Sequence, residues 1–504
     1  MDLQLLIIIF LTLILLYLYI NLKPSNSNTS LVNSVNLPPH PWKLPIIGHL
    51  HHLSASLPHQ ALANLSQKLG PIVHLQLGEF TAVVISSPDL AKQVMKTNDL
   101  SFANRPKLLG AEINGYNYTD IAFAPYGDYW RQMRKICILE LLSAKKVKSF
   151  ESVREQETWS LVETMLNEGP VVINLTDKIF TVMNVIACRV SVGSRCKDEG
   201  KFVELIEEVI SLSGGFDLSD LFPSMKLLHL VTGMRKKLMM IHRKIDKMLD
   251  DIIFDHQQRR CCDGVRTDEN EDVLDVLLRL KDDGELQFPL SYDNIKAVIM
   301  DMFGAGTDTS SVIIEWAMFE LIINPRVMQK LQGEIRRVLK GKEKVYESDL
   351  RELDYLRLVI KETLRVHPPF PLLLPRECRE KCEIGGYTIP VGTKVITNFW
   401  KIGRDPDYWT DPECFIPERF DESLIDFKGT HFEYIPFGAG RRICPGLAMG
   451  LANVELLLTR LLYHFNWELP NGVKAEDLDR SEVFGGTLKR KTDLYLVPSA
   501  YNTM

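Results

Sequence analysis

One cysteine of this chain stands in a setting that could do chemistry. It is Cys444, within the glycine-rich stretch 437–446 (FGAGRRICPG). Glycines let a backbone turn tightly and approach a flat group closely, and an arginine near a cysteine favours the thiolate over the thiol. The apolar, helix-forming run that follows would direct its positive N-terminal end toward the sulfur. This setting suits a thiolate that is the axial ligand of a haem iron, although a lone cysteine in a turn is by default structural.

A second set of candidates lies in the centre of a predicted long helix. Residues 292–323 read as one helix that ends before an Asn-Pro pair. Two glycines in its middle, Gly304 and Gly306, cost about 2 kcal/mol against alanine. The acid Asp308 and the alcohol Thr309 follow, and such a pair could deliver the protons that reductive cleavage of dioxygen requires. Close packing between helices is the alternative explanation.

Two further pairs of residues have helical spacing. Glu362 and Arg365 are three residues apart, and Trp130 and Arg134 are four apart, so each pair shares one helical face. An exposed Glu–Arg pair would contribute at most about 1 kcal/mol, and Trp130 alone would be a core aromatic residue. Spacing by itself therefore leaves both pairs open to a structural explanation.

Taken in chain order, the motifs resemble those of the cytochrome P450 family. They are WRxxR at 130–134, AGxDT at 305–309, ExxR at 362–365, PxRF at 417–420 and the cysteine loop at 437–446. The resemblance covers essentially the whole chain, and it points to plant members of the microsomal A-type clan of secondary metabolism. It implies a mainly α-helical cytochrome P450 fold with a long central helix, a small β region and a single N-terminal transmembrane helix.

The resemblance also implies a role for each motif. Asp308 and Thr309 would be the catalytic pair that manages protons. The haem b cofactor would be bound by Trp130, Arg134, Arg376, Arg442 and the axial ligand Cys444. Arginine suits the haem propionates because its planar fork of donors matches a carboxylate. Glu362, Arg365 and Arg419 would form a buried charged cluster, which fixes geometry and does no chemistry.

The implied substrate pocket is predominantly apolar. Its lining residues would be Ile113, Ile121, Phe123, Gly304, Thr307, Leu372, Leu373 and Phe484. The pocket offers few charges to hold an acid, so we expect a neutral hydrophobic substrate. We place a terpenoid first, with an alkaloid or a phenolic scaffold as the alternatives.

The reaction implied is that of a haem-thiolate monooxygenase, which inserts one oxygen atom into the substrate and releases the other as water. No GxGxxG nucleotide fingerprint is evident, so electrons from NADPH would arrive through a separate NADPH-cytochrome P450 reductase. Cytochrome b5 is a further candidate partner. A basic face could dock the reductase, or could simply be solvated; it comprises Lys135, Lys145, Lys146, Lys148 and Arg441. A reductase-independent haem-thiolate isomerase and a haem-binding membrane protein without turnover are the rival functions, and the acid–alcohol pair argues against both.

The start of the chain predicts a membrane anchor. Residues 3–22 are almost uninterruptedly apolar, and about twenty such residues span the roughly 30 Å of a bilayer core. A cleavable signal peptide is the alternative, but no positive segment precedes the run and no small-residue cleavage site follows it. We expect an anchor at 1–23, a polar linker and proline-rich hinge at 24–48, and the catalytic domain at 49–504. The protein would be single-pass in the endoplasmic reticulum membrane and face the cytosol.

Composition and residue patterning bear on the partners, the cysteines and the secondary structure of the chain. The net charge of the 504 residues is −6, so no strongly basic surface argues for nucleic acid. The nine cysteines show no paired framework and are expected to be free thiols. Alternation around Gly78 predicts a β-hairpin over 72–87, and helical patterns cover 236–254 and 327–340. The charged stretch 257–272 is expected to be a solvated loop.

Overall fold

The structure is a computed structural model that describes residues 36–54, 56–194, 199–212, 217–225, 232–263 and 271–501. The predicted anchor at 1–23 and the linker up to residue 35 lie outside this described part. Among the described residues, none of the helices combines the length and the apolar character that a membrane crossing requires.

The described chain is mainly helical. Its α-helices are α2 (Pro58–Leu69), α3 (Pro88–Lys92), α4 (Leu109–Asn114), α5 (Asp128–Ile136), α6 (Ala144–Ser149), α7 (Glu151–Glu168), α8 (Leu175–Val192), α9 (Glu199–Leu212), α10 (Leu218–Leu221), α12 (Met234–Asp263), α13 (Val273–Asp283), α14 (Tyr292–Ile323), α15 (Pro325–Val338), α16 (Asp354–Val366), α17 (Phe399–Ile402) and α18 (Leu447–His464). The strands are β1 (Ile72–Leu77), β2 (Phe80–Ile85), β3 (Ile173–Asn174), β4 (Arg376–Glu377), β5 (Cys382–Ile384), β6 (Tyr387–Ile389), β7 (Lys394–Thr397), β8 (Phe465–Glu468), β9 (Glu482–Phe484), β10 (Leu488–Arg490) and β11 (Tyr495–Ala500).

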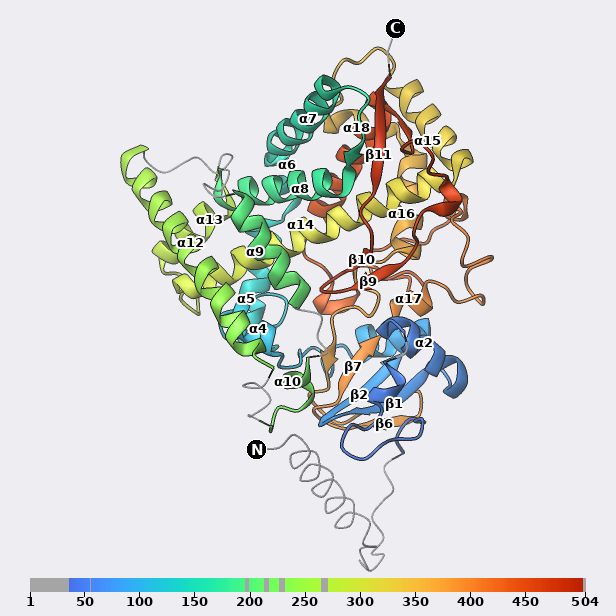
Figure 1. Cartoon of the computed structure of the whole chain (residues 1–504). Coiled ribbons are helices and arrows are strands. Elements are labelled where there is room, and N and C mark those ends of the chain that lie inside the picture. Colours follow the sequence, from blue (N-terminus) through green and yellow to red (C-terminus); the bar gives the residue numbers. More distant parts are fainter. Residues whose placement is uncertain are drawn as a thin grey trace, which may run out of the picture.

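Helix α14 is the central element of the fold. Its 32 residues correspond to about 48 Å of helix, and it packs against α8, α13, α16 and α18. Figure 1 shows it crossing the helical part of the molecule, with helices on both sides. It begins with a capping box in which the side chains of Ser291 and Asn294 bond each other's backbone amides, and it ends at Asn324 because Pro325 follows. The predicted helix over 292–323 is confirmed.

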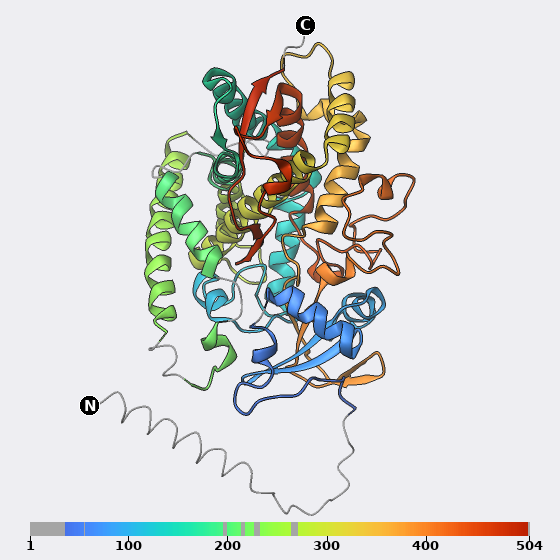
Figure 2. The same ribbon diagram turned by 45° about the vertical axis from the view of Figure 1, so that its right-hand side comes forward.

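A small sheet lies at one end of the molecule. Its strand order is β1-β2-β7-β4, and Figures 1 and 2 show it below the helices, with α2 beside it. The predicted hairpin over 72–87 is confirmed: Ile72 pairs with Ile85 and Leu77 with Phe80. Gly78 makes the turn with a φ of 63°, which glycine adopts without steric cost. Apolar side chains of this sheet form a core cluster that also contains Leu372.

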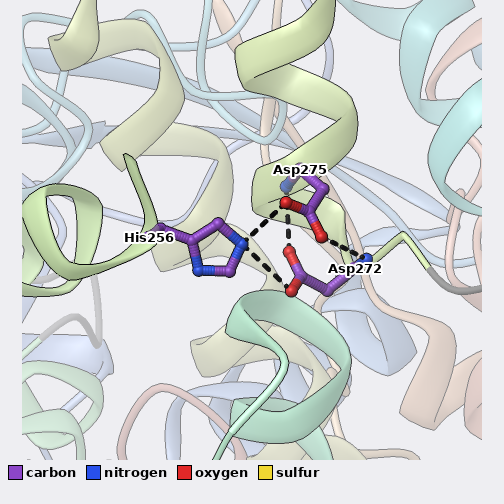
Figure 3. A group of neighbouring side chains, drawn as sticks. All are labelled: His256, Asp272 and Asp275. Atoms are coloured by element: carbon purple, nitrogen blue, oxygen red, sulfur yellow. Dashed lines mark hydrogen bonds and ion pairs between the residues drawn. The ribbon is translucent and has the colours of Figure 1, made fainter. Parts of the chain in front are cut away.

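The expectation of a solvated loop over 257–272 is wrong at both ends. Helix α12 continues to Asp263, and Asp272 is 3% exposed. His256 Nε2 lies 3.2 Å from Asp272 Oδ2 and 2.9 Å from Asp275 Oδ1, and Figure 3 shows the ring directed at both carboxylates. Asp272 and Asp275 also form the capping box that begins α13. The charged residues were misread because they neutralise one another in three dimensions and so need no solvent.

Candidate active site

The cysteine loop depends on glycine for its shape. Gly440 has a φ of 70°, and a Cβ atom there would lie 2.1 Å from the carbonyl oxygen of Met95 and 2.8 Å from Asp99. No side chain fits, so the backbone of the loop can lie directly on these two residues. The Cys444 amide donates to the carbonyl of Phe437 at 3.0 Å, which closes the turn just before α18 begins.

The Cys444 side chain is exposed, although neighbouring residues surround its sulfur closely enough to affect its pKa. Burial raises the pKa of the Cys444 thiol, whereas the backbone amides of Gly446 and Leu447 and the charge of Arg134 lower it. The thiolate is the form of cysteine that binds a metal ion. The charge that acts on this sulfur is that of Arg134, a residue that the sequence analysis assigned to the propionates.

The middle of α14 presents small side chains on one face. Ala305 is exposed and Gly304 is partly exposed, although the residues after them, such as Thr307, are buried. A Cβ atom on Gly304 would meet nothing within 4 Å. Thr309 lies one turn after Ala305 on the same face, and its Oγ1 donates to the Ala305 carbonyl at 2.6 Å. Helix α14 packs against α18, the helix that follows the cysteine loop. A Cβ atom on Gly450 of α18 would lie 3.8 Å from Ser310 Oγ, the residue after the acid–alcohol pair.

The carboxylate of Asp308 lies on a different side of α14. Its side chain is only 2% exposed, and Oδ1 lies 2.6 Å from Lys489 Nζ on β10. The hydroxyl of Thr487 donates to Oδ2 at 2.6 Å. The sequence prediction missed Lys489. The signal that could have found it is a basic residue five positions after Phe484, which the sequence assigns to the pocket.

The predicted anion site is a group of buried arginines. Arg442 donates to the carbonyls of Ala103 at 2.9 Å and Ala124 at 2.6 Å, and its guanidinium carbon lies 4.1 Å from the ring centroid of Trp130. Burial, and then the nearby charge of Arg376, lower the pKa of Arg442 to about 9.

Three more arginines complete this group, and one of them was not predicted. Arg134 donates to the carbonyl of Ile443, and Arg376 donates to Asp99 at 2.7 Å. The unpredicted member is Arg105, which is 7% exposed and donates to Leu374 and Pro375 carbonyls at 2.6 and 2.8 Å. Burial and three neighbouring arginines lower the pKa of Arg105 well below its usual range. The four arginines form a positive region that would be stabilised by bound carboxylates.

The charged cluster is buried as expected. Glu362 and Arg365 are fully buried and joined at 2.8 Å, and Arg419 Nε lies 3.0 Å from Glu362. Arg365 also donates to the carbonyls of Gly403 and Pro412, both at 2.7 Å. The cluster therefore holds the irregular segment 403–419 against α16.

The predicted pocket residues divide among different parts of the core. Ile121 belongs to the main core, whereas Leu372 and Phe484 belong to the cluster beside the sheet. Ile113 lies in a third cluster, against Leu238 of α12. The remaining predicted lining residues are Phe123, Gly304, Thr307 and Leu373. Thr307 is fully buried with an unpartnered Oγ1, and Leu373 has a φ of 50°, which is strained for a bulky residue and typical of functional segments.

These observations fit a bound haem. The cysteine side chain is exposed, the adjacent helix carries small residues, and the arginine group has more positive than negative charge. An axial thiolate, a flat macrocycle and two carboxylates are the groups that such a site accepts.

Comparison with known proteins agrees with this geometry. A family profile described as Cytochrome P450 matches residues 38–497. The chain therefore belongs to the cytochrome P450 family, and it is a cytochrome P450 monooxygenase by class. Membership implies haem b on a cysteine thiolate and electrons supplied from NADPH through a reductase.

The chain is also similar to individual enzymes of this family. The chain is 54% identical to premnaspirodiene oxygenase of Hyoscyamus muticus, over 94% of both chains. It is 54% identical to germacrene A hydroxylase of Barnadesia spinosa, over 94% of this chain and 95% of that one. It is 53% identical to desmethyl-deoxy-podophyllotoxin synthase of Sinopodophyllum hexandrum, over 93% and 92%. Among solved structures, a zebra fish cytochrome P450 with abiraterone superposes with a TM-score of 0.76 at 24% identity, over 88% and 99% of the two chains, which shows the shared fold.

The group of His256, Asp272 and Asp275 has the spacing of metal ligands but does not suit a metal. Burial lowers the pKa of His256, but its hydrogen bonds to the two carboxylates outweigh burial and raise the pKa to about 9. Arg259 Nη2 lies 3.1 Å from Nδ1, so in the neutral ring too the proton is on Nε2. Without a lone pair at Nε2 the ring offers no ligand atom in this orientation. We interpret the group as an ion pair that joins α12 to α13.

Proposed function

We propose that this protein oxygenates a hydrophobic plant specialised metabolite, and that the metabolite is a terpenoid. The observation that carries the proposal is the similarity, at 54% identity over nearly the whole chain, to enzymes named for oxidising premnaspirodiene and germacrene A. The apolar side chains of Ile121, Leu372 and Phe484 suit such a hydrocarbon, because they offer no partner for a charged substrate.

In this proposal Cys444 is the axial ligand of haem b. Bound there, haem supplies the activation of dioxygen, with one oxygen atom transferred to the substrate and the other released as water. Trp130, Arg134, Arg376 and Arg442 would hold the propionates, and we add Arg105 to this set because it lies among the same buried arginines. Each of these arginines has five N–H donors, so it could bond a carboxylate while it keeps its hydrogen bonds to backbone carbonyls.

Protons reach the site along α14. Thr309 donates to the Ala305 carbonyl on the small-residue face, where its hydroxyl can pass a proton into the pocket. Asp308 is held by Lys489, which is 31% exposed and so connects the buried carboxylate with solvent. The acid–alcohol pair thus has an outer member on the solvent side and an inner member on the pocket side.

The chain would be anchored by residues 1–23 in the endoplasmic reticulum membrane, single-pass, with the catalytic domain 49–504 in the cytosol. The hinge 24–48 would hold that domain at the bilayer. Support comes from the described part of the hinge, where Trp42 and Ile46 are 63% and 48% exposed. Exposed apolar side chains next to a membrane segment favour contact with lipid.

The electron donor would be NADPH-cytochrome P450 reductase, with cytochrome b5 as a further partner. Lys135, Lys145 and Lys148 are exposed and remain candidates for a docking face, as does Arg441, which pairs with Asp99. The proposal of Lys146 for that face is wrong. Its side chain is buried and its Nζ donates to the carbonyl of Glu271 at 2.6 Å.

The test is turnover of the full chain in microsomes with reductase and NADPH. Premnaspirodiene, germacrene A and amorpha-4,11-diene form the terpenoid arm of the panel, named after substrates of relatives. A podophyllotoxin-type precursor forms the phenolic arm, because one relative of nearly equal identity carries that name. Oxygenated product from the terpenoid arm supports the proposal. Product from the phenolic arm alone would show that the substrate is phenolic and not a terpenoid.

Further measurements distinguish the proposed monooxygenase reaction from the alternative functions. The carbon monoxide difference spectrum of the reduced protein reports the thiolate, and a spectrum of the imidazole-ligated type would refute Cys444 as ligand. Turnover with a peroxide substrate but none with reductase would identify an isomerase instead. Haem binding without either activity would identify a non-enzymatic haem protein.

A further inference from the structure

The segment 120–124 is held in place almost entirely by side chains from other elements. On one side lies Asp301 of α14, whose Oδ2 accepts from the amide of Ile121 at 2.6 Å and from the amide of Ala122 at 3.4 Å. The Phe123 amide donates to Asp120 Oδ1 at 3.1 Å. Carboxylates that accept from backbone amides make strong, charge-assisted hydrogen bonds, so Asp301 defines where this segment begins.

On the other side, the carbonyls of the same segment are held by the anion site. Trp130 Nε1 donates to the Ile121 carbonyl at 3.1 Å, and Arg442 donates to it at 3.3 Å. Arg105 Nε donates to the Ala122 carbonyl at 3.0 Å, and Arg442 donates to Ala124 at 2.6 Å. The Ile121 residue is thus fixed through its N–H by α14 and through its C=O by the side chains that would bind the propionates.

The residues that lead into the segment are strained. Tyr116, Asn117 and Tyr118 have φ values of 47°, 61° and 61°. Left-handed conformations of this kind cost non-glycine residues of the order of 1 kcal/mol each and persist only where the surroundings enforce them. Hydrogen bonds hold this strained turn: the amide of Asn117 donates to the carbonyl of Glu112 at 2.8 Å, and the hydroxyl of Tyr116 donates to Asp246 at 2.9 Å. The segment 120–124 therefore starts from a fixed turn.

Asp301 also lies on the face of α14 that borders the site. It precedes Ala305 and Thr309 at spacings of four residues, which places all three on one helical face. Ala305 is exposed and Asp301 partly exposed, although α14 crosses the core. The sequence assigns Ile121 and Phe123 to the pocket. Both residues therefore belong to a segment that α14 itself positions.

We propose that Asp301 is a positioning residue of the substrate pocket. Its bonds to Ile121 and Ala122 set the wall formed by segment 120–124, jointly with Arg442 and Arg105 on the opposite side. The shape of the pocket and the occupancy of the anion site are thereby coupled through one peptide segment. The inference rests on the proposed function only for the identity of the pocket, because the hydrogen bonds hold whatever the substrate is.

The experiment compares D301A and D301N with the control D293N in the haem-loaded full chain. Asp293 lies on the same helix and is exposed. Hydrogen–deuterium exchange is followed on the peptide that contains the amides of Ile121 and Ala122. Loss of a charge-assisted hydrogen bond should speed their exchange about tenfold or more in D301A, and less in D301N, whose amide oxygen still accepts. D293N should leave the exchange unchanged.

Ligand binding supplies the second readout. Imidazole is small and reports access to the iron, whereas 4-phenylimidazole is bulky and also contacts the pocket wall. We expect the Kd of 4-phenylimidazole to rise about fivefold to tenfold in D301A, with partial recovery in D301N and little change for imidazole. A merely destabilised protein would weaken both ligands together.

Each outcome decides the proposal. Unchanged exchange of Ile121 and Ala122 in folded D301A overturns it, and so does an equal loss of affinity for both imidazoles. If D301A does not fold, D301N decides alone through its exchange rate relative to D293N. Failure of every terpenoid and phenolic substrate would refute the proposed function while leaving the exchange result, and hence the role of Asp301, intact.

Discussion

Replacing Lys489 by methionine tests the assignment of the proton-handling pair most directly. Lys489 Nζ lies 2.6 Å from Asp308 Oδ1, the carboxylate is 2% exposed, and the lysine is 31% exposed. K489M keeps the length and apolar character of the stem and removes the charge. Among the described residues, the carboxylate of Asp308 then keeps the Thr487 hydroxyl as its partner, at 2.6 Å.

The magnitude follows from the burial of the two partners. Breaking a fully buried ion pair costs about 3–5 kcal/mol, and an exposed pair is worth about 0–1 kcal/mol. With one partner buried and the other one-third exposed, we expect K489M to lower the free energy of unfolding by about 1–3 kcal/mol. The protein should still fold and bind haem, because neither Lys489 nor Asp308 contacts the cysteine loop in the hydrogen-bond pattern.

The functional effect should appear in proton delivery. Without Lys489, Asp308 loses its connection to solvent. We therefore expect the product formed per NADPH consumed to fall about tenfold, and hydrogen peroxide release to account for the remaining NADPH. K491M is the matched control, since Lys491 is an exposed lysine two residues further on. If K489M has a normal carbon monoxide spectrum and forms as much product per NADPH as the wild type, Lys489 and Asp308 do not deliver protons to the site. An equal loss in K491M would mean that general charge, and not this ion pair, is responsible.

Three further predictions concern stability. G440A should lower the free energy of unfolding by about 3 kcal/mol or more, because a Cβ atom would lie 2.1 Å from the Met95 carbonyl. Thermal unfolding and haem content measure this effect. The control is G333A on α15, where a Cβ atom meets nothing within 4 Å, and this variant should be neutral or slightly stabilising. E362Q should cost about 3–5 kcal/mol in denaturant unfolding, because it leaves Arg365 and Arg419 buried without their shared carboxylate, and a change below 1 kcal/mol would contradict the cluster's role. Burial raises the pKa of Glu315 from 4.5 to about 7, so its contribution to stability is full below pH 4.5 and is lost as the pH rises through 7. E315Q should therefore be more stable than the wild type at pH 8, by up to about 3 kcal/mol, and no more stable at pH 4.5; an equal gain at both values would exclude titration as the cause.

The sequence predicts the fold where a regular element carries the signal. The helix over 292–323 has a cap at one end and a proline at the other, and α14 matches it residue for residue. The hairpin around Gly78 is equally local, since its turn and its alternation lie within fourteen residues. Local patterns of this kind are set by backbone geometry and need no knowledge of distant parts of the chain.

The prediction fails where distant charges meet. Asp272 reads as the last member of a solvated run, yet it pairs with His256 in the core. Lys146 reads as part of a basic surface, yet it bonds the Glu271 carbonyl 125 residues away. Residue type sets the cost of burying a charge, but only the fold determines whether a partner is present to offset that cost.

The same reasoning explains why motif residues were found and their supporting residues were not. Asp308 and Arg442 belong to short patterns that a reader of the sequence can identify. Lys489 and Arg105 act on those patterns from 181 and 337 residues away in the chain. Asp301 stands on the same helix as Asp308, but its partner Ile121 is 180 residues away. No local spacing marks these three residues.

The buried arginines show how irregular chain can surround a large cofactor. Backbone groups in the core need hydrogen-bond partners, and segments such as 120–124 and 403–414 have no regular secondary structure to provide them. Arg442 and Arg105 supply donors to the first segment and Arg365 to the second. An arginine has five donors, so it can bond carbonyls and a carboxylate together. Cofactor binding would therefore tighten these loops without rebuilding them, and a variant such as R105K, with three rotatable donors in place of a planar fork, should bind haem more weakly and exchange the Ala122 region faster in the same preparation.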